Sequence, residues 1–333
     1  MSCNRFLNIL FFFSFFPLLV HSAEMSDIVL HKAVLQNDVE LVKTLLAQGV
    51  STEQRDGKER TPIFRAAHRG YDEIILILLD ANADPNAIDK WGNTPLFEAA
   101  QQGHITSMNL LIASDAIVDI KNKHTETPLY IAVRNNQTLV AKQFLKKNAD
   151  PNVWIEGKTF APLHYAAMRS DVDLLEALVV AGAQVNARGE LGATPLHMSA
   201  AHGCVLAVEH LLANGANINA QTDNGATPLH YAVDFGYTNV AEVVKILLEN
   251  GADRTIENKR GQTFEGQRKT ALHLSVDNQV TAINPIANDL PPVTHELNDI
   301  QEHKPYRRKG AIGFVCSFIG LAILGVFLWR KLR

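Results

Sequence analysis

The apolar and polar residues between about positions 26 and 280 follow a pattern that returns every 33 residues. Most copies begin with Thr-Pro and an apolar residue, and the fifth copy has alanine in place of threonine. The clear starts are Thr61, Thr94, Thr127, Ala161, Thr194 and Thr227, separated by 33, 33, 34, 33 and 33 residues. A degenerate copy precedes them near Ile28, and the next start after Thr227 comes 43 residues later, at Thr270. A fixed period of this length predicts a stack of similar structural units.

Each copy predicts two helices separated by a tight turn. Threonine before proline is typical of a helix start, because its side chain can cap the helix and proline fits the first helical turn. Nine residues after each start stands a residue that tolerates positive φ, which predicts the end of the first helix. These residues are Asn37, Gly70, Gly103, Asn136, Gly203 and Gly236, with Ser170 as the exception. The second helix is expected to end at Gly49, Asn82, Asp115, Asn148, Gly182, Gly215 and Gly251.

These motifs resemble the ankyrin repeat family closely. The resemblance rests on Thr194-Pro-Leu-His197 and Thr227-Pro-Leu-His230, on pairs such as Ala166-Ala167, and on endings such as Gly215-Ala-Asn-Ile-Asn219. It covers about residues 26–280, roughly three quarters of the chain. It implies an all-α fold, a solenoid of helix-turn-helix units with β-hairpin fingers between them. Full copies would start near 28, 61, 94, 127, 161, 194 and 227, with a truncated copy from 270.

The N-terminal 23 residues have the pattern of a secretory signal peptide. One cation, Arg5, precedes an apolar run from Phe6 to Val20, and the small residues Ser22 and Ala23 follow. A 15-residue helix is only about 22 Å long, which is short of the roughly 30 Å needed to cross a bilayer. We therefore expect residues 1–23 to be a signal peptide, with an uncleaved anchor as the alternative.

The C-terminal segment predicts a transmembrane helix. Residues 311–329 are 19 consecutive residues without a charge, and the basic tail 330–333 follows. Residues 281–310 are expected to form a linker that ends in a basic juxtamembrane segment. A cleaved signal peptide would place the body outside the cytosol, as a single-pass membrane protein with a short cytoplasmic tail. The alternative is a tail-anchored protein with a cytosolic body.

Charge is divided unevenly between the body and the end of the chain. All 35 Asp and Glu lie between Glu24 and Glu302, a span that holds 23 of the 31 Lys and Arg and therefore carries −12. The last thirty residues carry +7. An acidic body argues against nucleic acid as a partner, because neutralising phosphates requires clustered cations.

The residues show no pattern that predicts catalysis, and we expect no enzymatic activity, no cofactor, no metal and no small-molecule substrate. Histidine recurs once per copy, at His31, His164, His197, His230 and His273. Neighbouring helices pack about 8–10 Å apart, so one histidine per copy cannot share a zinc ion, which needs nitrogens at about 2.1 Å. The family resemblance implies instead that each histidine hydrogen-bonds the adjacent repeat.

A protein partner is expected on the concave face that the first helices and the fingers would form. Side chains four, seven and eight residues after each start should point there. In the later copies several of these are aromatic or methionine, which is typical of an interaction patch. With two finger tryptophans, the candidate partner-binding residues are Trp91, Trp154, Tyr165, Met168, Met198, Tyr231 and Phe235. The alternative is that some of these side chains cover neighbouring helices as core.

The sequence therefore favours a membrane-anchored scaffold or adaptor that binds another protein. Two alternatives remain open. One is a secreted or surface-displayed host-interaction factor of an intracellular microbe, and the other is an accessory subunit of a membrane complex.

Overall fold

The computed structural model describes residues 29–153, 160–234 and 239–267, which are built from paired α-helices. The first helices of the pairs are α3 (Val29–Leu35), α5 (Pro62–Arg69), α7 (Pro95–Gln102), α9 (Pro128–Arg134), α11 (Pro162–Met168), α13 (Pro195–Ala201) and α15 (Pro228–Asp234). The second helices are α4 (Val39–Ala47), α6 (Asp72–Asp80), α8 (Ile105–Ala113), α10 (Thr138–Lys146), α12 (Val172–Val180), α14 (Val205–Ala213) and α16 (Val240–Glu249). One short 3-10 helix, η1 (Glu190–Gly192), lies in the loop before α13.

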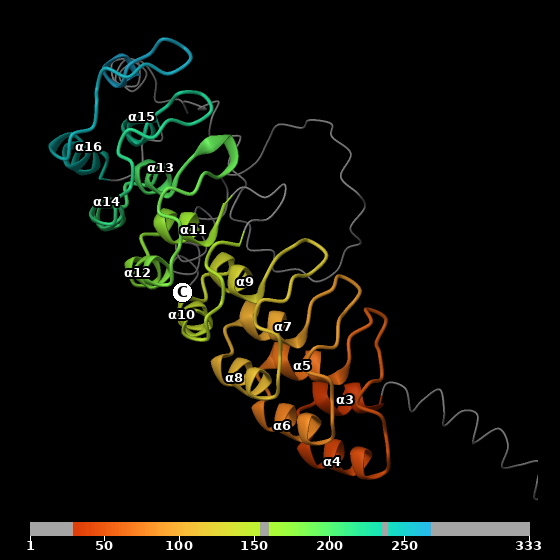
Figure 1. Ribbon diagram of the computed structural model, residues 1–333. Helices are drawn as coiled ribbons and strands as arrows, with labels where there is room; N and C mark the ends of the chain where they lie inside the picture. Colours follow the sequence, from red (N-terminus) through yellow and green to blue (C-terminus); the bar gives the residue numbers. More distant parts are fainter. Residues whose placement is uncertain (1–28, 154–159, 235–238, 268–333) are drawn as a thin grey trace, which may run out of the picture. The chain divides into compact units, whose positions relative to one another are not determined.

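The helices form two rows, and each helix packs on its own pair-mate and on the equivalent helix of the next pair (Figure 1). Contacts run from α3 through α5 and α7 to α15 in the first row, and from α4 through α6 to α16 in the second. The long loops between pairs project on the side of the first row. We call these loops the fingers and name each by the copy that it precedes. The stack confirms that consecutive copies bury their apolar faces against one another.

The turns between helices adopt the backbone conformation that the sequence predicts. Asn37, Asn136 and Ser170 have φ of 54°, 60° and 55°. Ser170 therefore adopts the left-handed conformation, although serine is not a residue type that predicts it. The seven residues that were expected to end the second helices all have positive φ, from 61° at Asn82 to 91° at Gly251. Tolerance of this conformation explains why asparagine and glycine recur at these positions.

The threonines at the helix starts do not all act as the same cap. The Thr127 hydroxyl accepts the Tyr130 N–H at 3.3 Å, as the sequence predicts. Thr61 and Thr94 are buried and make no such bond. In later copies the hydroxyls of Thr194 and Thr227 lie 2.9 and 2.8 Å from Nδ1 of the histidine three residues on. The proline and the extended backbone before it, rather than a uniform hydroxyl cap, are common to these helix starts.

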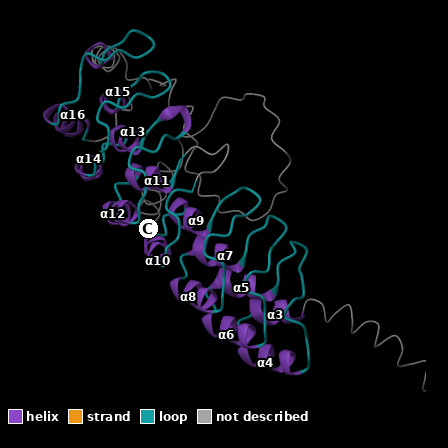
Figure 2. Ribbon diagram, in the orientation of Figure 1, coloured by secondary structure: helices purple, strands orange, loops and turns teal. Residues whose placement is uncertain are grey.

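The fingers are loops and turns, where β-hairpins were expected. Figure 2 shows helices joined by loops, and in the described ranges the pairing is limited to one isolated antiparallel bridge, Glu257 with Thr263. Each finger in the described ranges is closed by a backbone bond of its own, such as the Asp89 N–H to the Asn93 carbonyl at 3.0 Å, and further backbone bonds join neighbouring fingers. The Lys90 N–H donates to the Lys58 carbonyl at 3.1 Å, and the Lys123 N–H donates to the Trp91 carbonyl at 2.9 Å.

A helical turn begins at Phe264, directly after Thr263, so the described part of the chain already enters another helix there. His230 Nε2 lies 3.1 Å from the Gln262 carbonyl, just as His197 Nε2 lies 3.1 Å from the Ala226 carbonyl before the Thr227 start. Both observations make Thr263 equivalent to a repeat start, 36 residues after Thr227. The start expected at Thr270 lies outside the described residues.

Several other sequence-based expectations also concern residues outside the described ranges. They are the signal peptide 1–23, the linker 281–310, the transmembrane helix 311–329 and the tail 330–333. Within the ranges that are described, none of the helices combines the length and the apolar character that crossing a bilayer requires.

Candidate protein-interaction surface

Short-range hydrogen bonds to an aspartate or asparagine shape fingers 2, 3 and 4, which comprise residues 55–60, 88–93 and 121–126. The Asp56 carboxylate accepts the N–H groups of Lys58 at 2.8 Å and Arg60 at 3.0 Å. Asp89 accepts those of Trp91 and Asn93, each at 2.9 Å. Asn122 repeats the arrangement with His124 and Glu126, at 2.9 and 3.0 Å. Such side chains hold a turn without a strand partner, which explains why the fingers need no β-hairpin.

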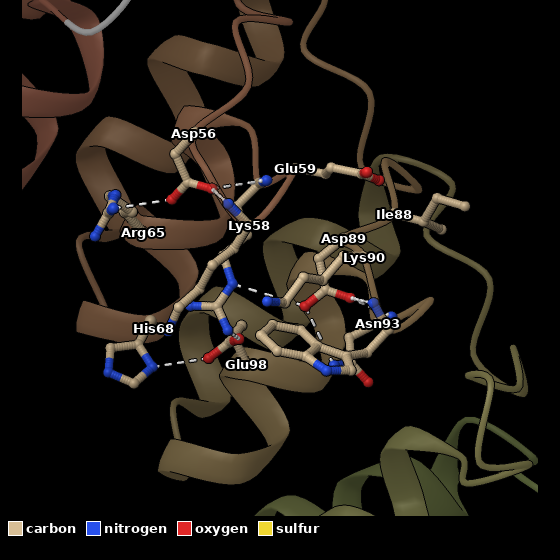
Figure 3. Close-up of polar contacts among 12 residues, drawn as sticks. Asp56, Lys58, Glu59, Arg65, His68, Ile88, Asp89, Lys90, Asn93 and Glu98 are labelled. Atoms are coloured by element: carbon tan, nitrogen blue, oxygen red, sulfur yellow. Dashed lines mark hydrogen bonds and ion pairs between the residues drawn. The ribbon is translucent and has the colours of Figure 1, made fainter. Parts of the chain in front are cut away.

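A charged network lies at the base of fingers 2 and 3 (Figure 3). The Arg60 guanidinium lies 3.6 Å from the Asp89 carboxylate and 3.3 Å from that of Glu98. His68 Nδ1 lies 2.8 Å from the other oxygen of Glu98. Asp89 and Glu98 are both buried. Buried carboxylates require partners of this kind, so the network joins α5, α7 and their fingers.

Trp91 lies within this network and is surrounded by cations. The Lys90 ammonium is 4.3 Å from the indole centroid, the Arg60 guanidinium 5.6 Å and the Lys58 ammonium 5.8 Å. The indole is half-buried. Cations are attracted to the electron-rich face of an aromatic ring, and this attraction holds the three positive charges close to Trp91.

Tyr165 and Met168 lie at the surface of an aromatic and methionine cluster in the later copies. They are half-buried and pack on buried Phe160, Met198 and Tyr231. The Tyr165 hydroxyl is 3.2 Å from that of Tyr130, whose pKa is raised by burial. The Arg169 guanidinium lies 5.6 Å from the Tyr165 ring and donates to the Val133 carbonyl. Tyr165 is therefore held in one place while part of it remains exposed.

The structure separates the candidate binding residues into three groups. Trp91, Tyr165 and Met168 are half-buried, whereas Met198 and Tyr231 are buried, with 0% and 4% of their surface exposed. Trp154 and Phe235 lie outside the described residues. The expectation that the fourth residue after each start is exposed is wrong at Glu98, Ile131, Met198 and Tyr231, all of which are buried. The neighbouring first helices pack closely enough to cover this position.

The recurring histidines join neighbouring copies, as the family resemblance implied. His164 Nε2 donates to the Ala193 carbonyl at 3.1 Å, and its Nδ1 accepts the Ala161 N–H at 3.2 Å. His197 and His230 bond in the same way, to the carbonyls of Ala226 and Gln262. Burial lowers the pKa of His164 to about 4 and that of His197 to about 3, so both rings are neutral near pH 7. No group of three or more His, Cys, Asp or Glu in the described residues is arranged to hold a metal ion.

Asparagine side chains in the loops that follow the second helices also join consecutive copies, and the sequence did not lead us to expect these bonds. Asn86 donates to the Asp115 carbonyl at 2.9 Å and accepts the Ile117 N–H at 2.8 Å. Asn152 and Asn186 make the equivalent pair of bonds two and three copies further on. The recurrence of asparagine in endings such as Asn148-Ala-Asp-Pro-Asn152 and Gly182-Ala-Gln-Val-Asn186 was the signal that could have revealed them.

A family model described as ankyrin repeats (three copies) matches residues 12–89, 81–154, 163–258 and 207–284. These overlapping matches cover most of the chain. No curated protein matches it.

Proposed function

The chain belongs to the ankyrin repeat family, and from this we propose that it is a membrane-anchored scaffold or adaptor without catalytic activity. Ankyrin repeats are protein–protein interaction modules and are generally non-catalytic. The observation that carries the proposal is the stacking of helix pairs into two rows, with the fingers on the side of the first row. We call the exposed side chains of the first helices and the fingers the finger face. A protein is the proposed partner, with neither nucleic acid nor a small-molecule substrate.

Trp91, Tyr165 and Met168 are proposed to contact the partner directly. Each is fixed by neighbours yet half-buried, and anchors of this kind lose little conformational entropy on binding. Met198 and Tyr231 would contribute indirectly, by supporting Tyr165 and Met168, which belong to the same packed cluster. Trp154 and Phe235 complete the proposed set.

The test is co-isolation of the partner by the tagged full-length chain. We expect the double variant Tyr165→Ala and Met168→Ala to lose most of the partner that the unmodified chain retains. The matched control changes Leu139 and Leu206 to alanine, since both are exposed apolar residues of the second-helix row. Equal loss in both variants, or in neither, would contradict the proposed face.

Membrane attachment is proposed through residues 311–329, with residues 1–23 as a cleaved signal peptide. The support is the uncharged 19-residue run and the basic residues that flank it. The body would then be exported and the tail cytoplasmic. Protease treatment of sealed vesicles, with N-terminal sequencing of the mature chain, tests both segments. A body digested from the cytosolic side would instead indicate the tail-anchored arrangement.

A microbial host-interaction factor and an accessory subunit of a membrane complex would use the same finger face. They differ in the partner, so identifying the co-isolated protein distinguishes them.

A further inference from the structure

Fingers 2, 3 and 4 present positive charge on a body whose net charge is negative. Their carboxylates are largely used internally, since Asp89 and Glu126 are buried and paired with Arg60 and Arg134. Glu59 is the one carboxylate of these three fingers that the structure shows exposed. The exposed charge of these fingers is therefore positive, although the body as a whole carries −12.

The ammonium groups of Lys90 and Lys123 and the guanidinium of Arg55 lie against neutral groups. Lys123 Nζ donates to the Lys90 carbonyl at 2.7 Å, and Lys90 lies against the Trp91 ring. Arg55 donates to the carbonyls of Glu59 and Ile88, at 2.9 and 2.8 Å. Carbonyls and an indole orient a cation without cancelling its charge. The side chains of Arg55, Lys90 and Lys123 are exposed, and adjoining fingers bring them together in one row.

The two helix rows also differ in charge, and the first row, which lies beside the positive fingers, is the less acidic one. The described second helices carry nine Asp and Glu against four Lys and Arg. The described first helices carry two Asp and Glu against four Lys and Arg. The second-helix row is thus more acidic than the first-helix row beside the fingers. A charge distribution of this kind orients an approaching charged partner.

We propose that fingers 2, 3 and 4 bind an acidic segment of a partner protein, with carboxylates over Lys90 and Lys123 and an apolar side chain beside Trp91. This inference rests on the proposed scaffold function and specifies the chemistry of the partner. The positive run is short, because in finger 6 Arg188 pairs with Asp223 at 2.8 Å and Glu190 lies close by in sequence. A short acidic segment fits three fingers, whereas nucleic acid needs a longer track of cations.

The test uses the full chain in neutral detergent and a fluorescein-labelled glutamate-rich peptide, followed by fluorescence anisotropy. A glutamine-rich peptide of the same length and an oligodeoxythymidine of equal charge are the comparison probes. We expect the glutamate peptide to bind at least about tenfold more tightly than either, with affinity falling as salt is raised. Preference for the oligonucleotide, or no binding of the glutamate peptide at low salt, would overturn the proposal.

A matched pair of variants locates the binding. K90E/K123E should weaken the glutamate peptide by at least about tenfold. K146E/K147E makes the same change of charge at the exposed end of α10, in the acidic row, and should stay within about twofold. Thermal melts establish that both variants fold, and the less drastic K90Q/K123Q replaces the first variant should it unfold. Equal weakening by both variants would show a non-specific charge effect and contradict the site. If the peptide fails to bind while partner capture still depends on Tyr165 and Met168, this inference fails and the scaffold function stands.

Discussion

At the scale of single residues, one imidazole ring joins two repeats. In the fifth, sixth and seventh copies the histidine accepts a hydrogen bond from the start of its own helix and donates one to the next copy. The second to fourth copies have Phe64, Phe97 and Tyr130 at this position, and Asp or Asn side chains brace the fingers that lead to those helices. The first copy again has a histidine, whose His31 Nε2 lies 3.0 Å from the Gln54 carbonyl, so copies two to four are the full copies without a histidine at this position.

The change His197→Phe removes both of these bonds and leaves the buried Ala226 carbonyl and Thr194 N–H without this partner. We expect it to lower the free energy of unfolding by about 1–3 kcal/mol. Urea unfolding followed by circular dichroism measures the loss. His210→Phe, on α14, is the control and should change the midpoint little. Equal stability of the two variants would show that the bridge contributes nothing.

Side-chain burial was the part of the candidate site that the sequence could not supply. Periodicity predicts which way a residue points from its own helix, and it did bring Tyr165, Met168, Met198 and Tyr231 into one cluster. Whether such a residue is covered depends on the packing of the neighbouring copy. Met198 and Tyr231 are buried for this reason. The same dependence hid Glu98, which resembles a surface carboxylate in the sequence but is paired with Arg60 and His68.

At the scale of the elements, the turns are the best-predicted feature of the fold. A requirement for positive φ restricts the residue type, so the turns within the first six pairs and the ends of all seven second helices were correctly predicted, apart from the residue type of Ser170. The fingers were anticipated less well, since the hairpin expectation came from family resemblance. Side-chain bonds from Asp56, Asp89 and Asn122, together with bonds between fingers, shape these loops instead.

Asn148, at the end of α10, tests how much a residue that tolerates positive φ contributes to the stability of the fold. Its φ is 61°, so Asn148→Ala should destabilise the fold by about 1 kcal/mol, whereas Asn148→Gly should be neutral or stabilising. The neighbouring Lys147, with φ of −94°, provides the control, because Lys147→Ala should have little effect. Denaturant midpoints of the three variants decide the matter. An alanine at 148 that matches glycine there would contradict the backbone explanation.

At the scale of the whole molecule, stability depends on contacts between neighbouring copies. Each helix pair packs on the pairs before and after it, and the histidine and asparagine bridges lie at these same junctions. Stability of such a stack is approximately a sum of copy and junction terms. A change that acts at several junctions together should therefore affect the entire stack.

Acidification is such a change. The folded-state pKa of His164 and His197 lies well below the ordinary value of 6.5, so the unfolded chain binds protons that the folded chain does not. Stability should be fully present above pH 6.5 and decline as the pH falls below it. Each of the two rings contributes up to about 1.4 kcal/mol per pH unit. Asp234 acts in the opposite sense, because burial raises its pKa to about 6.

Urea midpoints at several values between pH 7.5 and 5 measure this dependence. The decline should be steeper in the unmodified chain than in the double variant His164→Phe and His197→Phe. Parallel declines would show that other groups govern the acid response. The variant Leu206→Ala, at an exposed residue of α14, serves as the control, because it changes no titratable group.

The most direct test of the central claim, that the finger face receives the partner, is site-specific photocrosslinking in cells. A benzophenone side chain would be placed at Gln102 or His124 on the finger face and at Leu139 or Leu206 on the second-helix row. All four positions are exposed. The account predicts partner crosslinks from the first two positions and few from the others. Crosslinks that form mainly from Leu139 and Leu206 would contradict it.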